Sequence, residues 1–167
     1  MRGFRLVLLA VFLLLVLRQA QAQTFTGRVV RVLDGDTIAI ERTTNQGRSQ
    51  VRVQLHGIDA PEPEQPHGGR AKQALTELAL GKTAEVRVKE TDAYGRAVGV
   101  VLVGERNINK QMVKDGHAWW YRKYAPEETE LRDLEAAAKK AKRGLWADAN
   151  PTPPWEFRRQ QSKSRGQ

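Results

Sequence analysis

The chain has 167 residues, with 28 Lys and Arg against 19 Asp and Glu, which gives a formal net charge of +9 at pH 7. It contains no cysteine, which excludes a disulfide-stapled fold and any metal site built on thiolates. A chain of this length can enclose one hydrophobic core, and its basic character suits a polyanionic partner.

The first 22 residues have the pattern of a signal peptide. Arg2 and Arg5 precede an apolar stretch over residues 6–17, and Ala20-Gln21-Ala22 has the small-x-small pattern of a cleavage site. The apolar stretch is short for a membrane span, so we expect cleavage after Ala22 and no stable membrane association afterwards. The expected location is secreted or periplasmic; an uncleaved signal anchor is the alternative.

Three strands are predicted in the next part of the chain. Apolar residues between positions 26 and 40 are interrupted by Asp34-Gly35-Asp36, a pattern that indicates two strands around a tight turn. Residues 50–58 alternate between apolar and polar side chains, which predicts a third strand. Residues 62–69 are rich in Pro and Gly and are expected to form a loop.

Further elements alternate between helices and strands. Helical spacing over residues 71–79 predicts a helix that ends at Gly81, and residues 85–89 and 97–103 read as two more strands. A short helix is expected over residues 108–114, before Gly116.

The final helix is predicted to open at Pro126, with glutamates in its first turn, and to close at Gly144. Residues 148–167 lack apolar periodicity and are expected to form an extended or disordered basic tail. Five short strands with a helix after the third predict an α+β fold, a five-stranded oligonucleotide-binding-type β-barrel with about three packed helices, spanning residues 23–147.

Two acidic motifs indicate a metal site. Asp36 and Asp59 fall at the ends of neighbouring predicted strands and could offer oxygens to one cation, with the Ala60 carbonyl and water completing the shell. Oxygen-only ligation indicates Ca²⁺ rather than zinc. The alternative is that Asp34-Gly35-Asp36 is simply a hairpin turn, which Asp-Gly favours.

Four segments carry a resemblance to a known family: 32–37 (VLDGDT), 57–62 (GIDAPE), 92–96 (DAYGR) and 144–146 (GLW). In this order and at these spacings they resemble the staphylococcal nuclease (thermonuclease) family, over about residues 24–146. The resemblance implies that Asp36, Asp59 and the Ala60 backbone bind calcium, with Thr37 close by.

The resemblance also implies roles in catalysis. Glu62 matches the general base that activates the attacking water, and Arg96 matches an arginine that binds the phosphate and stabilises the transition state. The alternatives are an ordinary loop glutamate and a solvent-facing turn arginine.

One position departs from the family pattern. A second active-site arginine is expected five residues before the metal aspartate, where this chain has Gln54. Arg52 lies two residues earlier, on the same face of the predicted strand, and our hypothesis is that it partly replaces the missing charge. The alternative is a slower enzyme.

Aromatic residues suggest where bases stack. Tyr94 could donate a hydrogen bond to the phosphate, and Tyr124 matches one of two tyrosines that flank the nucleotide in the family. Arg122 replaces the other tyrosine. For Trp119 and Trp120 we favour packing between helices over base stacking.

The resulting prediction is a secreted, Ca²⁺-dependent, monomeric phosphodiesterase that cleaves DNA and RNA. The resemblance implies loss of the 5′ oxygen and 3′-phosphate products. The main alternative is a catalytically weak or silent barrel that binds nucleic acid or another polyanion, and a third is a structural envelope domain.

Overall fold

The first three strands form an antiparallel meander, in a computed structural model that describes residues 23–45 and 47–165. β1 (Thr24–Val32) pairs with β2 (Thr37–Thr44), and β2 pairs with β3 (Gly47–Leu55). Ile38 and Val53 face each other in this register and are both fully buried. The acidic turn lies between β1 and β2, as the sequence predicted.

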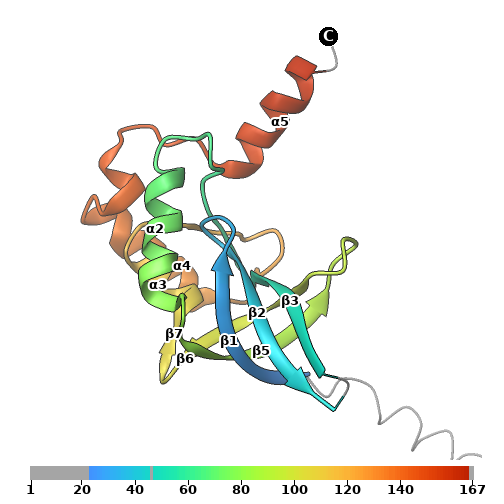
Figure 1. The fold of residues 1–167 in the computed structure, drawn as a ribbon. Helices are drawn as coiled ribbons and strands as arrows, with labels where there is room; N and C mark the ends of the chain where they lie inside the picture. Colours follow the sequence, from blue (N-terminus) through green and yellow to red (C-terminus); the bar gives the residue numbers. More distant parts are fainter. Residues whose placement is uncertain (1–22, 46, 166–167) are drawn as a thin grey trace, which may run out of the picture.

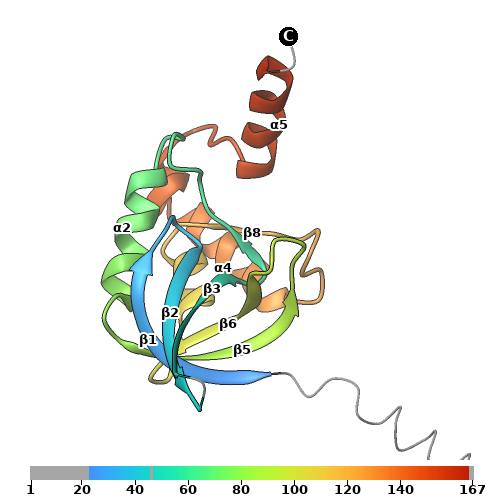
Figure 2. The ribbon, with the colours of Figure 1, turned by 45° about the vertical axis from the view of Figure 1, so that its right-hand side comes forward.

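The remaining long strands close this meander into a barrel (Figures 1 and 2). β5 (Thr83–Thr91) pairs with β1 and with β6 (Ala97–Val103), both in antiparallel fashion. β6 then runs parallel to the end of β3, where Gln54 pairs with Val98. The predicted five-stranded barrel is therefore confirmed.

Short strands connect the barrel to the helices. β7 (Arg106–Asn107) extends the sheet beside β6, and β4 (Ile58–Asp59) pairs with β8 (Trp119–Trp120). In the second pair Asp59 lies opposite Trp119, so the second acidic motif is held by backbone pairing to a segment sixty residues further along the chain.

Three helices cover one side of the barrel (Figure 1): α2 (Gly68–Ala79), α3 (Ile108–Lys114) and α4 (Thr129–Lys140). Their apolar faces join the barrel interior in one core, to which Leu75, Met112 and Leu131 contribute buried side chains. Of the residues in the described ranges, none belongs to a helix that is both long enough and apolar enough to cross a membrane.

The predicted bounds of the final helix were wrong at both ends, and α4 ends at Lys140 rather than at Gly144. α4 begins at Thr129 rather than at Pro126, because residues 121–128 form tight turns in which the amides of Ala125 and Glu128 bond to the carbonyls of Tyr121 and Ala125. The short 3₁₀ helix η1 (Gly144–Ala147) follows α4.

The tail is also not extended throughout, because it forms helix α5 (Pro154–Arg165). Pro154 suits a first helical turn, Glu156 lies near the N-terminus, and Lys163 and Arg165 lie in the last turn, which matches the helix dipole. The predicted signal peptide lies outside the described residues.

Candidate active site

The acidic motifs line a cavity of about 710 Å³ at one end of the barrel. The β1–β2 turn, the end of β3, the loop after β4, the β5–β6 turn and α5 all contribute to its wall. Its charged lining residues are Asp34, Asp36, Asp59, Glu62, Glu90, Asp92, Arg96 and Arg158. These five parts of the chain therefore bring together charged groups that are far apart in the sequence.

Asp36 lies at the centre of the hydrogen-bond network in this cavity. Its Oδ1 accepts bonds from the Thr37 hydroxyl at 3.0 Å and from Gln54 Nε2 at 3.3 Å, and its Oδ2 accepts one from the Ala60 amide at 2.9 Å. Burial raises the pKa of Asp36 well above its ordinary value, and the charges of Asp34 and Asp59 raise it further. A cation nearby would favour the ionised form.

Asp59 is bound by an arginine from the C-terminal helix. Arg158 Nη1 and Nη2 donate to the two carboxylate oxygens of Asp59 at 3.0 and 2.7 Å, and Nη1 also donates to Glu62 Oε1 at 2.7 Å. Burial raises the pKa of Asp59, and the bonds and charge of Arg158 offset this only in part. The contact joins residues 99 and 96 positions apart, and no local sequence signal indicates it.

Glu62 is positioned by a short loop with its own hydrogen bonds. The Glu62 amide donates to Gln65 Oε1 at 2.9 Å, and the Gln65 amide donates back to the Glu62 carbonyl at 2.9 Å. Gln65 is itself buried, so its side chain fixes the backbone of the loop from the protein interior. The Glu62 side chain remains partly exposed.

Arg96, which also lines the cavity, is held by the turn that precedes it. Its Nε donates to Asp92 Oδ2 at 2.7 Å, and its amide donates to Asp92 Oδ1 at 2.9 Å. Gly95 has a φ of 77°, which explains why glycine is found at this point of the turn. Because the Asp92 side-chain bond uses Nε, the two terminal nitrogens of the guanidinium can donate to other partners.

Most of the residues predicted for the site line this one cavity: Asp36, Thr37, Gln54, Asp59, Ala60, Glu62, Tyr94, Arg96 and Tyr124. Tyr94 and Tyr124 are 86% and 58% exposed, respectively, so both rings are available to a strand of nucleic acid. Trp119 is buried and Trp120 Nε1 donates to the Ala125 carbonyl at 2.9 Å, as expected for packing residues.

Two predicted residues do not line the cavity. Arg52 is exposed and pairs with Ala39 in the sheet. It lies two residues before Gln54 in β3, which places it roughly 7 Å further along the strand from the cavity. The structure therefore gives no support to the idea that Arg52 replaces the missing arginine. Arg122 is exposed and also lies outside the lining.

The residues present fit a hard cation, although they do not form a complete cage. Within residues 23–45 and 47–165, no group of three or more His, Asp or Glu side chains has a metal-binding arrangement. Asp36 and Asp59 are both buried, and the charge of Asp59 raises the pKa of Asp36, while the Arg158 guanidinium provides positive charge at Asp59. Such a donor set suits a cation that keeps water and substrate oxygens as further ligands.

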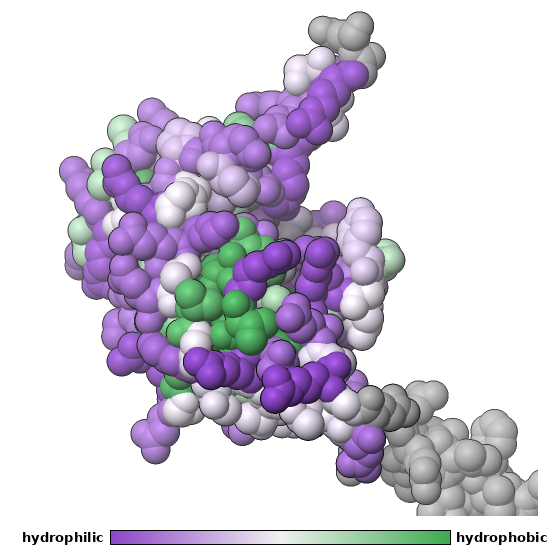
Figure 3. All heavy atoms as spheres, viewed as in Figure 1, coloured by the Kyte–Doolittle hydropathy of each residue, from purple (hydrophilic) through white to green (hydrophobic). Residues whose placement is uncertain are grey.

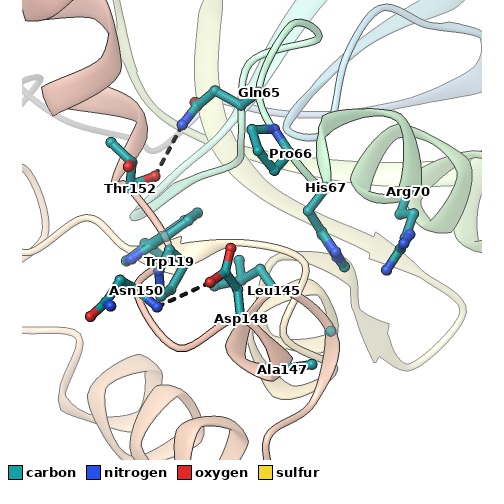
Figure 4. A pocket seen from close by; sticks show the side chains of 12 residues that line it. Gln65, Pro66, His67, Arg70, Trp119, Leu145, Ala147, Asp148, Asn150 and Thr152 are labelled. Atoms are coloured by element: carbon teal, nitrogen blue, oxygen red, sulfur yellow. Dashed lines mark hydrogen bonds between the residues drawn. The ribbon is translucent and has the colours of Figure 1, made fainter.

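A second cavity, of about 370 Å³, lies between the loop around Gln65 and the segment that precedes α5 (Figure 4). Its charged lining residues are Arg70 and Asp148, and His67 lies beside them. It lacks the paired carboxylates of the first cavity and therefore offers no comparable site for phosphoryl chemistry.

Known proteins resemble this chain over most of its length. A family model described as "Staphylococcal nuclease homologue" matches residues 52–148. A protein of Shigella flexneri named "Micrococcal nuclease" is 42% identical over 145 residues, which cover 81% of each chain. An Escherichia coli O157:H7 protein named "Uncharacterized endonuclease" is 44% identical over 133 residues, which cover 79% of this chain and 84% of that protein.

Proposed function

This chain belongs to the staphylococcal nuclease family and is a nuclease that hydrolyses phosphodiester bonds, and we propose that it requires Ca²⁺ and cleaves both DNA and RNA. One observation carries the proposal: the paired carboxylates Asp36 and Asp59 share a cavity with Glu62 and Arg96. The family is metal-dependent, and a carboxylate and carbonyl donor set favours a hard cation such as Ca²⁺.

The proposed reaction is an in-line attack of water on phosphorus. Glu62 takes a proton from the water as the new O–P bond forms, and the bond from phosphorus to the 5′ oxygen breaks. The departing 5′ oxygen then takes a proton from solvent, which leaves a 3′-phosphate on the other product. Bound Ca²⁺ would supply charge stabilisation on a phosphate oxygen and help to orient the water.

Arg96 has the geometry to stabilise the transition state. Because Asp92 fixes its Nε, the two terminal nitrogens can donate to non-bridging phosphate oxygens without a further ordering step. Tyr94 and Tyr124 line the same cavity, and their proposed role is to stack on flanking bases or to bond to phosphate. The site needs no base-specific contact for this chemistry.

Export is a separate part of the proposal. It is supported by the sequence of residues 1–22 alone, in which a charged start, an apolar stretch and a small-residue cleavage pattern follow one another. We propose a monomer released to the periplasm or beyond.

Digestion of single-stranded DNA tests the proposed chemistry. The purified protein is assayed with Ca²⁺ and with a chelator, beside Glu62→Gln and the matched control Glu64→Gln, an exposed carboxylate two residues away. We expect Glu62→Gln to lower kcat by on the order of 10²–10⁴ because the general base is lost, with Glu64→Gln unchanged.

Two further readouts complete the test. Treatment of the products with a phosphatase before 3′ extension distinguishes 3′-phosphate from 3′-hydroxyl ends, and a matched RNA oligonucleotide tests the sugar preference. Hydrolysis that persists without metal and in Glu62→Gln would sink the mechanism.

A further inference from the structure

Helix α5 is anchored at its first turn against the active-site cavity. The Thr152 carbonyl accepts a bond from Gln65 Nε2 at 3.0 Å just before the helix begins (Figure 4). The Trp155 ring stacks on Tyr121, with centroids 5.3 Å apart and 2° between the ring planes. It also meets the edge of Trp119 at 6.4 Å. The start of α5 is therefore fixed by a hydrogen bond and by aromatic packing.

The rest of α5 extends away from the body of the protein (Figures 1 and 2) and is hydrophilic on the face seen in Figure 3. Arg158 follows Trp155 by three residues, so both side chains lie on one face of the helix. Because Trp155 is packed on Tyr121, which lines the cavity, this face carries Arg158 to Asp59 and Glu62.

The balance of charge in the cavity shows why this arginine matters. Six carboxylates line the cavity, but the guanidinium groups among its lining residues are those of Arg96 and Arg158. Arg96 is already paired with Asp92. The carboxylates that line the cavity would therefore repel a phosphodiester that approaches Glu62. Arg158 provides positive charge there, because its Nη1 lies 2.7 Å from Glu62 Oε1.

Arg158 also lies outside the residues that match the family model, which end at position 148. The strand position five residues before Asp59 is occupied by the uncharged Gln54, which bonds to Asp36. Positive charge thus reaches this side of the cavity from α5 instead of from the barrel strand.

We propose that Arg158 is a second phosphate-binding arginine of this active site, delivered by α5 and held on Asp59 and Glu62 until metal and nucleic acid arrive. The proposal rests on the proposed function. A cation bound to Asp59 must compete with Arg158 for the same two carboxylate oxygens. Once released, the half-exposed guanidinium remains beside Glu62, where it can donate two bonds to a non-bridging phosphate oxygen pair.

Metal binding in the absence of substrate tests the first part. Ca²⁺ is titrated calorimetrically into the wild-type protein, Arg158→Gln and the matched control Arg159→Ala, whose side chain is exposed on the same helix. We expect Arg158→Gln to bind Ca²⁺ on the order of tenfold more tightly, because the competing charge is gone. Arg159→Ala should match the wild type. Equal affinities for all three proteins would show that Arg158 does not occupy the metal ligands.

Turnover at saturating Ca²⁺ tests the second part. We expect kcat for single-stranded DNA to fall by on the order of 10² in Arg158→Gln, because one transition-state donor is lost, with Arg158→Lys intermediate and Arg159→Ala unchanged. If kcat in Arg158→Gln equals or exceeds that of the wild type, Arg158 does not assist turnover and the proposal is wrong. An inactive wild-type protein would instead contradict the proposed function itself, and this inference with it.

Discussion

His67 and His117 form a pair that must share one proton between facing nitrogens. His67 Nε2 and His117 Nδ1 are 3.0 Å apart, and the rings stack with centroids 5.2 Å apart. Burial lowers the pKa of His67 to about 4, with smaller contributions from the charges of His117 and Arg70, and burial lowers that of His117 as well. With both rings protonated, two donors would face each other.

This pair predicts a loss of stability in acid. Between pH 6.5 and about 4 the unfolded chain binds a proton at His67 that the folded chain does not bind, so the free energy of unfolding falls as the pH falls. Allowing for solvent screening of this half-exposed group, we expect about 1 kcal/mol, or roughly 3 °C in Tm. His67→Asn keeps a residue that tolerates the φ of 73° found there.

Melting curves at pH 7 and pH 5 check this expectation. The Tm of the wild type should fall by about 3 °C more than that of His67→Asn between the two values. The carboxylates of the active site titrate in both proteins and cancel in the comparison. Equal losses of Tm would mean that the histidine pair does not govern acid stability.

At the scale of single residues, the sequence indicated most but not all of the residues that make up the proposed site. Asp36, Asp59, Glu62 and Arg96 lie in recognisable short motifs, and the structure brings them to one cavity. Arg158 could not be predicted, because its position depends on how the tail packs at Trp155 rather than on any local pattern. Arg52 lies on the same strand face as Gln54 but outside the cavity lining, because two residues of strand place it roughly 7 Å further from the strand end.

Among the elements, the loop that holds Glu62 and the start of α2 are tightly packed together. A Cβ atom added to Gly68 would lie 2.0 Å from the Glu62 carbonyl oxygen and 3.1 Å from Pro63 Cα. Real side chains do not approach backbone this closely, so the loop would have to move. The next residue, Gly69, has open space at the same point, and it provides a matched control.

Gly68→Ala is expected to affect stability and catalysis together. We expect it to lower the free energy of unfolding by about 2 kcal/mol and kcat by on the order of tenfold, because the displaced loop carries Glu62, the proposed general base. Gly69→Ala should retain kcat and gain roughly 0.5–1 kcal/mol from higher helix propensity. Urea unfolding and single-stranded DNA hydrolysis measure the two effects. Similar results for the two variants would contradict the packing argument.

Elements with strong local signals were predicted best. The predicted helix over residues 108–114 is confirmed with the same bounds, since Asn107 caps its N-terminus through a bond from the Lys110 amide. The predicted start of α4 was wrong: Pro126 and the glutamates after it have the composition of a first helical turn, but they lie in the tight turns that precede the helix. α5 was missed because a helix with little apolar periodicity depends on tertiary anchoring.

The whole molecule combines an acidic cavity with a basic exterior. The formal net charge is +9 for the full chain, or +6 (9 − 3) after the proposed removal of residues 1–22 with their three arginines, yet six carboxylates line the cavity. Exposed Arg122 and Lys123 lie next to Tyr124 at the rim, and Lys123 Nζ is 5.4 Å from that ring. The basic exterior therefore attracts a polyanion at long range, while the carboxylates of the cavity repel a phosphate at short range. In the proposed mechanism, a bound metal and Arg158 offset this local repulsion.

Added salt should consequently lower the affinity for nucleic acid much more than it lowers kcat. A single strand that contacts about three cationic side chains releases enough counterions for the affinity to fall on the order of tenfold between 50 and 200 mM NaCl. Fluorescence anisotropy of a labelled oligonucleotide with Glu62→Gln, at constant Ca²⁺, measures this slope without cleavage. The kcat of the wild type at saturating DNA should change by less than about twofold, because the groups that stabilise the transition state are close to the phosphate and little screened. A binding constant that does not respond to salt would show that the basic exterior does not bind the strand, and that recognition is confined to the cavity.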